Sequence, residues 1–81
     1  MREGFGRPIK RSVTVAGHET SVSLEPVFWS QLERAAREAG KPVNALIAEI
    51  DVLRLDSRPT PNLTSALRQW LFARASREQA N

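Results

Sequence analysis

The sequence predicts a small, mainly α-helical domain in which short strands precede the helices. Residues 20–25 alternate hydroxyl and apolar side chains, which is the pattern of a strand with one buried face. Residues 26–54 hold two stretches with apolar residues at helical spacing, divided by Gly40, and a third such stretch follows a linker at 55–61. The 81 residues allow one domain. Because a single core is thin below about 80 residues, oligomerisation is a common remedy.

The strand at 20–25 organises the rest of the chain. Val22 and Leu24 point to one face, and Ser21 and Ser23 point to the other. Pro26 ends the strand and can open a helix, because the first helical position needs no amide proton. A lone strand cannot satisfy its own backbone groups. We therefore expect it to pair with the same strand of a second chain in a homodimer.

A second strand is predicted at residues 11–15, with Val13 and Val15 on one face. Residues 16–19 supply a turn in which Gly17 can take a positive φ and His18 has a turn role. The strand at 11–15 either forms a hairpin with the next strand or extends the intermolecular ribbon at its edge. Residues 1–10 have no periodicity and predict a flexible basic arm. The domain then covers residues 11–76, and residues 77–81 form a frayed tail.

Two helices are predicted at residues 26–39 and 42–54. Trp29 is expected beside the apolar stripe of the first helix, with its ring in contact with the dimer partner or the third helix and its N–H near water. The surface of this helix suggests the ion pairs Glu33–Arg37 and Arg34–Glu38 at i, i+4 spacing. The stripe residues of the two helices are Phe28, Leu32, Ala35, Ala36 and Ala39, then Val43, Leu46, Ile47, Ile50 and Leu53.

A third helix is predicted after the linker, capped by Thr60 or Asn62 and ending near Ser76. Its apolar stripe must be covered. The helix either packs on its own dimer or presents Trp70, Leu71 and Phe72 to another protein. The stripe residues are Leu63, Ala66, Leu67, Trp70 and Leu71.

Composition and charge exclude several classes of function. The net charge is +3, and the excess of positive charge lies before residue 12 and after residue 61, whereas the middle of the chain is slightly acidic. The chain has no cysteine, so it has neither a disulfide nor a thiolate metal site. We find no catalytic constellation, no metal-ligand cluster and no glycine-rich phosphate loop, and we therefore predict neither an enzyme nor a cofactor. No apolar run approaches the ~18 residues of a membrane span, and residues 1–10 lack the apolar core of a signal peptide. A cytoplasmic protein is expected.

The order of motifs resembles a known fold family. A strand, Glu25-Pro26, Phe28-Trp29, a helix, Gly40 and the run Asn44-Ala45-Leu46-Ile47 resemble a ribbon-helix-helix domain of the Arc/MetJ type. The segments 17–25 and 62–68 are similar to one bacterial subfamily with an extra C-terminal helix. The resemblance covers roughly residues 11–72. It implies an intertwined homodimer with an antiparallel intermolecular β-ribbon.

The resemblance also implies a small transcriptional regulator that binds double-stranded DNA. The ribbon would lie in the major groove with Ser21 and Ser23 at base edges, and the N-terminus of the second helix would hold a phosphate. The DNA-binding residues are then Arg7, Lys10, Arg11, Ser21, Ser23, Lys41 and Asn44. The dimer interface would comprise Val22, Leu24, Phe28, Leu46, Ile47 and Ile50.

An alternative function follows from two departures from the family pattern. Serines occupy the groove-facing positions where such repressors favour Arg, Lys, Asn or Gln, and Pro42 replaces the usual hydroxyl cap. In the alternative, the ribbon-helix-helix dimer is a protein-interaction module, antitoxin-like or a scaffold, without sequence-specific DNA readout. Its partner would bind the C-terminal helix or the acidic ribbon edge at Glu19 and Glu25.

Overall fold

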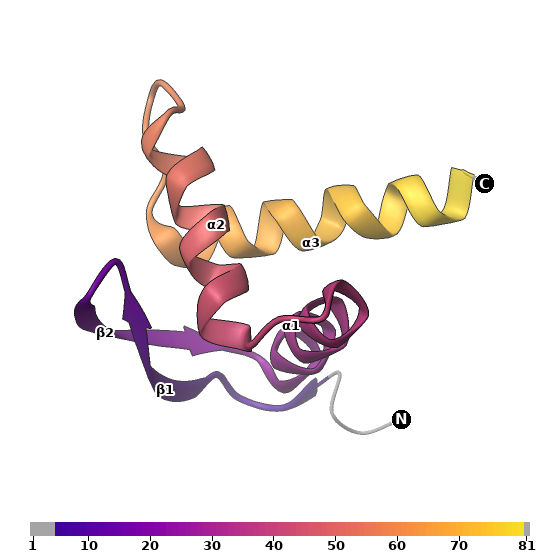
Figure 1. The fold of residues 1–81 in the computed structure, drawn as a ribbon. Coiled ribbons are helices and arrows are strands. Elements are labelled where there is room, and N and C mark those ends of the chain that lie inside the picture. The colour runs from indigo at the N-terminus through magenta and orange to yellow at the C-terminus, as the bar shows by residue number, and fades with distance from the viewer. Residues whose placement is uncertain (1–4, 81) are drawn as a thin grey trace.

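The computed structural model describes residues 5–80 and shows a β-hairpin followed by three helices (Figure 1). The predicted basic arm therefore lies partly outside the described residues. The strands are β1 (Ile9–Val15) and β2 (His18–Leu24). The helices are α1 (Pro26–Ala39), α2 (Val43–Leu55) and α3 (Leu63–Ala80). The order of elements is the predicted one, and the sequence placed both ends of α1 correctly.

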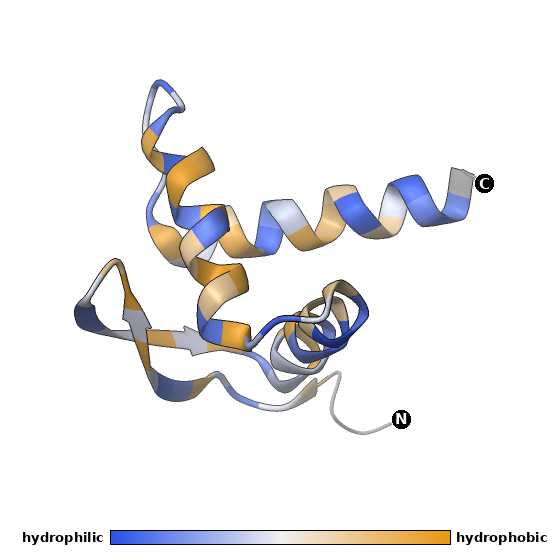
Figure 2. Cartoon of the chain, viewed as in Figure 1, coloured by the Kyte–Doolittle hydropathy of each residue, from blue (hydrophilic) through white to orange (hydrophobic). Residues whose placement is uncertain are grey.

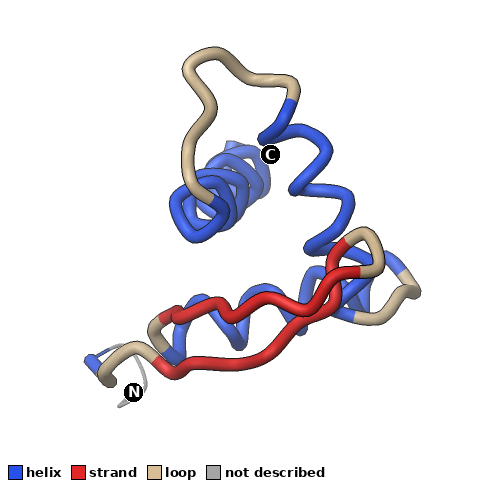
Figure 3. The backbone as a smooth tube through the Cα atoms, turned by 90° about the vertical axis from the view of Figure 1, so that its left-hand side faces the viewer, coloured by secondary structure: helices blue, strands red, loops and turns tan. Residues whose placement is uncertain are grey.

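The two strands pair with each other as an antiparallel hairpin, which is one of the two arrangements left open by the sequence (Figure 3). The pairing runs from Ile9 opposite Leu24 to Val15 opposite His18. The turn has two residues instead of the predicted four, Ala16 with φ 53° and Gly17 with φ 81°. Two successive positive φ values are typical of a type I′ turn, whose twist matches that of the flanking strands. His18 therefore begins β2.

The helix ends show why the chain turns where it does. At Gly40, φ is 69°, and the N–H of Lys41 donates to the carbonyl of Ala36 at 3.0 Å, which closes α1. Asn62 caps α3, because its side-chain oxygen accepts a hydrogen bond from the N–H of Ser65 at 2.8 Å. Thr60, the other predicted cap, donates to the carbonyl of Ser57 instead. The α3 helix continues past Ser76 to Ala80.

One hydrophobic core lies between the hairpin and the three helices, and α2 contacts β1, α1 and α3. Figure 2 shows hydrophobic residues concentrated on α2 and the first half of α3, whereas the end of α3 is mostly hydrophilic. All elements contribute side chains that are almost completely buried. The largest of these are Trp29, Leu24, Leu32, Ile47, Ile50, Leu67 and Val22.

Trp29 corrects one expectation from the sequence. Its side chain is 1% exposed, and its Nε1–H donates to the carbonyl of Ile9 at 2.8 Å rather than to water. The guanidinium of Arg11 lies 4.5 Å from the centre of the Trp29 ring and forms an ion pair with Glu33 at 2.8 Å. Glu33 thus pairs with β1 instead of Arg37, because the long Arg11 side chain extends across the ring. The predicted pair Arg34–Glu38 is present at 3.1 Å.

Two ion pairs connect α3 to the rest of the fold. Arg68 donates to both carboxylate oxygens of Glu25 at 2.9 and 3.2 Å, and Arg74 pairs with Glu38 of α1. A backbone hydrogen bond and then the Arg68 hydrogen bonds lower the pKa of the Glu25 carboxyl. Hydrogen bonds from Arg34 and from Arg74 lower the pKa of Glu38. Glu25 is therefore engaged by α3 and does not belong to the outer surface of the hairpin.

Candidate nucleic-acid interface

The outer face of the hairpin is entirely polar. Strand residues alternate between two faces, and the even positions of β1 share this face with the odd positions of β2. The register places three polar pairs side by side along it. These pairs are Lys10 with Ser23, Ser12 with Ser21, and Thr14 with Glu19, and all six residues are exposed. We call these six residues the polar ribbon face.

The opposite face of the hairpin packs against the core, which leaves the polar ribbon face at the surface. Val13, Val15, Val22 and Leu24 are at most 8% exposed and pack into the core. The hairpin is thus anchored by one face only. The two predicted base-contacting residues, Ser21 and Ser23, lie on the polar ribbon face as expected from the period-two pattern. Ser12 and Thr14 lie beside them and were not predicted.

The predicted cations of the N-terminal segment do not all lie together. Arg7 and Lys10 make no ion pair with any described side chain, and both lie at the open end of the hairpin. Arg11 lies on the inner face, where Trp29 and Glu33 hold its guanidinium. Side chains alternate between the two faces of a strand, so Arg11 lies on the same face as Val13 and Val15. The inner position of Arg11 could therefore have been predicted from the sequence. The structure separates Arg11 from the other two, and its DNA contact stays a prediction.

The predicted phosphate anchor lies at the start of α2. Pro42 is the N-cap of this helix and provides no side-chain hydrogen bond, and Asn44 is exposed in its first turn. Lys41 forms an ion pair with Glu49 and lines a groove of about 340 Å³ together with residues of α1, α2 and α3. The residues lining this groove include none from the hairpin. The anchor and the polar ribbon face are therefore separate surfaces.

The predicted dimer-interface residues are mostly buried within their own chain. Val22, Leu24, Leu46, Ile47 and Ile50 are at most 4% exposed. Phe28 is partly buried, and the guanidinium of Arg68 lies 5.6 Å from the centre of its ring. An intermolecular role for these residues stays a prediction.

Other apolar side chains are exposed instead. Val52, Leu53 and Leu55 at the end of α2 are 66%, 57% and 53% exposed, and Phe72 of α3 is 74% exposed. Of the three α2 residues, Leu53 was expected on the buried stripe. It is exposed because α3 covers only part of the α2 surface near its end.

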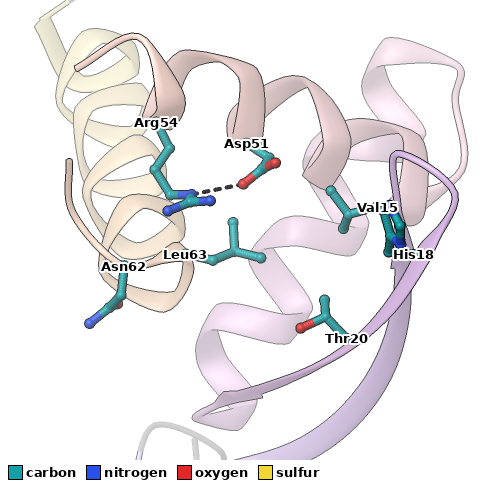
Figure 4. A pocket seen from close by; sticks show the side chains of 7 residues that line it. All are labelled: Val15, His18, Thr20, Asp51, Arg54, Asn62 and Leu63. Atoms are coloured by element: carbon teal, nitrogen blue, oxygen red, sulfur yellow. Dashed lines mark hydrogen bonds and ion pairs between the residues drawn. The ribbon is translucent and has the colours of Figure 1, made fainter.

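A pocket of about 320 Å³ lies between the inner edge of the hairpin, α2 and the start of α3 (Figure 4). Val15, His18 and Thr20 line it on the hairpin side. On the helical side, Arg54 donates from Nε to Asp51 at 2.7 Å and from a terminal nitrogen to the carbonyl of Pro61 at 3.1 Å. Asp51 is thus half of a partly buried ion pair within α2, and its partner Arg54 also joins α2 to the segment before α3.

Within residues 5–80, no group of three or more His, Cys, Asp or Glu side chains is arranged to hold a metal ion. None of the helices that the structure describes is both long enough and apolar enough to cross a membrane.

Comparison with known protein families gives a match that covers most of the chain. A family model described as "Ribbon-helix-helix domain" matches residues 8–75, which include both strands, α1, α2 and most of α3. No curated protein and no solved structure matches the chain significantly.

Proposed function

The chain belongs to the ribbon-helix-helix family, and from this membership and the polar ribbon face we propose that it is a small DNA-binding transcriptional regulator. Domains of this family are typical of small DNA-binding regulators and antitoxins, and they generally act as dimers that bind DNA. They are typically non-enzymatic. The polar ribbon face is the surface that enters the major groove.

The observation that carries this proposal is a two-stranded surface whose side chains do not pack into the hydrophobic core. All six residues of the polar ribbon face are exposed, and Arg7 and Lys10, which make no ion pair with any described side chain, lie at its open end. The major groove is about 12 Å wide and admits a two-stranded β-ribbon. Serine and threonine hydroxyls both donate and accept hydrogen bonds at base edges, and free cations bind the phosphates beside the groove.

A second contact and a dimer complete the proposal. The amides of the first turn of α2, with Asn44 and Lys41 nearby, hold a backbone phosphate. Lys41 must leave Glu49 to take part. The protein acts as a homodimer in the cytoplasm. The intermolecular ribbon that the family resemblance predicts would form along the edge of β2 that β1 does not occupy.

The test is a duplex-binding titration by fluorescence anisotropy at two salt concentrations. Wild type should bind duplex DNA, and log K should fall as log salt rises with a slope of about −0.9 for each phosphate contacted. The double variant Ser21→Glu with Ser23→Glu should lose at least tenfold in affinity, because two carboxylates per chain then face the groove. Both positions are exposed, so circular dichroism should show an unchanged fold.

The matched control places the same charges on α3. Ala73→Glu with Ser76→Glu also changes two exposed residues, far from the hairpin in the sequence. It should bind duplex within about twofold of wild type. Equal loss in both double variants would mean that only net charge matters, and it would overturn the assignment of the polar ribbon face. Absence of duplex binding by wild type at low salt would overturn the proposal as a whole.

One observation favours the alternative, a protein-interaction module. The polar ribbon face carries one cation, Lys10, and one anion, Glu19, so its formal charges cancel. Exposed apolar residues lie elsewhere, at Val52, Leu53 and Leu55 of α2 and at Phe72 of α3. Under this alternative, Leu53→Asp with Phe72→Asp abolishes partner binding and the ribbon variants do not. Under our proposal, Leu53→Asp with Phe72→Asp leaves the contacts of the polar ribbon face intact.

A further inference from the structure

The pocket between the hairpin, α2 and the start of α3, which we call the inner pocket, is separate from the polar ribbon face (Figure 4). Its volume of about 320 Å³ is at the lower end of the range of roughly 300–1,000 Å³ for small-molecule sites. Val15 and Leu63 are its apolar lining residues, and Thr20 supplies a hydroxyl from β2. Size and lining therefore suit one small molecule that has both an apolar and a polar part.

The Asp51–Arg54 pair gives the inner pocket one anion and one cation that can each bond further. Their side chains are 13% and 22% exposed, respectively. Oδ1 of Asp51 accepts a hydrogen bond from Nε of Arg54, and no described residue donates to the other carboxylate oxygen, Oδ2. Arg54 uses one further N–H for the carbonyl of Pro61, and a guanidinium has more N–H groups than these two. The pair therefore offers an acceptor and donors side by side.

We propose that the inner pocket binds a small α-amino acid with an apolar side chain. Its ammonium group donates to Oδ2 of Asp51, and its carboxylate accepts from the remaining N–H groups of Arg54. Its side chain lies against Val15 and Leu63. The charges of the ligand match those of the ion pair one for one. A ligand with a carboxylate alone would leave Asp51 uncompensated beside it, and a ligand with an ammonium alone would do the same at Arg54.

The alternation of β2 explains why a pocket is present behind the hairpin and why it is compatible with a dimer. Even-numbered residues of β2 lie on its inner face, where Val22 and Leu24 enter the core. His18 and Thr20, nearer the turn, are exposed and line the inner pocket instead. The proposed partner strand would pair with backbone groups at the free edge of β2, whereas the inner pocket uses side chains. The two surfaces do not compete for the same groups.

A ligand in the inner pocket should also act on the polar ribbon face, because both surfaces share β2. His18 and Thr20 alternate along this strand with Glu19 and Ser21. A ligand that contacts Thr20, α2 and the start of α3 fixes the turn end of the hairpin against the helices. Fixing a surface before it binds lowers the cost of binding, so we expect duplex affinity to rise about fivefold or more. This step rests on the proposed function, whereas binding of the amino acid does not.

An amide NMR titration of the full chain without DNA tests the site. The probes are L-valine, L-leucine, L-isoleucine, L-methionine and L-phenylalanine. At least one should bind with a Kd below about 5 mM, which is within reach of a ligand with so few non-hydrogen atoms. The amide signals that move should belong to residues that line the inner pocket. Failure of all five amino acids to bind, or signal changes confined to other parts of the chain, would overturn the proposal.

Analogues of the best ligand test whether the ion pair recognises both of its charged groups. For L-leucine these are isopentylamine, which lacks the carboxylate, and 4-methylpentanoate, which lacks the ammonium group. Each should bind at least tenfold more weakly than the amino acid. Equal binding of either analogue would refute the assignment of the two charges to Asp51 and Arg54.

Substitutions place the ligand in the inner pocket. Thr20→Phe fills the pocket from an exposed strand position and should weaken binding at least tenfold, with an unchanged circular dichroism spectrum. Ser76→Phe adds the same ring to an exposed position of α3 and should stay within about twofold of wild type. Equal effects of the two variants would overturn the location. If Asp51→Asn folds, it should bind the amino acid at least tenfold more weakly and 4-methylpentanoate more tightly than wild type does. Equal weakening of both ligands would mean that Asp51 has only a structural role.

A duplex titration with and without the saturating amino acid tests the connection to DNA. Duplex affinity about fivefold higher with the ligand is the expected result, and Thr20→Phe should show no such rise. Unchanged or lower affinity in wild type would overturn the connection alone and leave the ligand site standing. Absence of duplex binding by wild type, with or without the ligand, would refute the proposed function. The NMR titration contains no DNA, so it decides the ligand site whichever of these results is found.

Discussion

At the scale of single residues, Trp29 links β1 to the helices more closely than any other side chain. It is buried, it donates a hydrogen bond to Ile9, and its ring supports Arg11. The sequence placed Phe28 on the apolar stripe of the first helix and Trp29 beside it, whereas Trp29 is the aromatic residue that is fully buried and Phe28 is only partly buried. Phe28 and Trp29 differ by about 100° around the helix axis, and both lie near the edge of the stripe. The hairpin decides between them, because the carbonyl of Ile9 gives the indole a buried partner.

Replacing Trp29 with phenylalanine tests this role. Trp29→Phe keeps most of the ring but removes the N–H donor, so the Ile9 carbonyl loses the indole hydrogen bond. We expect the free energy of unfolding to fall by about 0.5–1.5 kcal/mol, measured by urea denaturation. Trp70→Phe is the matched control, because Trp70 is only partly buried and no described group accepts a hydrogen bond from it. Equal effects of the two substitutions would contradict the hydrogen-bonding role.

At the scale of elements, local signals placed both ends of α1 correctly, whereas the pairing of β2 could not be decided from local signals. Pro26 and Gly40 fix the ends of α1 through backbone geometry that each residue carries with it. The partner of β2 depends on a segment distant enough for several pairings, so the sequence left it open. The candidate site shows the same division. Parity along β2 placed Ser21 and Ser23 on the outer face, but Ser12 and Thr14 joined the site only once the register was known.

The turn of the hairpin offers a stabilising substitution. Ala16 has φ 53°, a left-handed conformation that costs an L-residue other than Gly, Asn or Asp about 1 kcal/mol. Ala16→Asn creates an Asn-Gly pair, the preferred type I′ sequence. We expect the free energy of unfolding to rise by roughly 0.5–1 kcal/mol, measured by thermal and urea denaturation.

A substitution at the next position, expected to have the opposite effect on stability, is the control for this turn. Gly17→Ala should destabilise the protein. No heavy atom lies within 4 Å of a Cβ built at Gly17, so its cost is conformational and not steric. A neutral Ala16→Asn together with a neutral Gly17→Ala would mean that the turn is not held in this conformation.

The docking of α3 should depend on pH. The pKa values of Glu25 and Glu38 are lowered from 4.5 in the folded protein, so both carboxylates stabilise it at neutral pH. As pH falls below 4.5, the unfolded state binds protons before the folded state does, and this stabilisation is lost. We expect urea midpoints to fall between pH 6 and pH 3. Glu25→Gln with Glu38→Gln should start lower at pH 6 and change less over this range.

Substitution of a different acidic residue, one that does not contact α3, provides the control for this pH dependence. Glu19→Gln changes an exposed carboxyl on the outer face of the hairpin, away from α3. It should follow the wild-type pH profile. If the double variant retained the full wild-type pH dependence, the two ion pairs with Arg68 and Arg74 would not be responsible for it.

At the scale of the whole molecule, the hairpin and the three helices of a single chain together enclose one hydrophobic core. The hairpin covers one side of α1 and α2, and α3 supplies Ala66, Leu67 and Leu71 to the same buried cluster. A minimal ribbon-helix-helix chain lacks this third helix. The additional helix is therefore part of the folding unit here, even though its last residues, 75–79, are exposed.

Truncation separates these two parts of α3. Ending the chain after Pro61 removes Leu67 and Leu71, which are 0% and 6% exposed, and uncovers their neighbours in the core. Each buried leucine contributes about 1.5–3 kcal/mol, so with the uncovered neighbours the loss approaches the whole stability of a small domain, about 5–15 kcal/mol. We expect the shortened chain to lack a cooperative unfolding transition by circular dichroism.

Ending the chain after Ser76 removes only residues outside the core and should lower the free energy of unfolding by less than about 1 kcal/mol. A chain of residues 1–61 that folds cooperatively would show instead that the hairpin, α1 and α2 suffice, with a second copy of the chain covering the surface that α3 leaves.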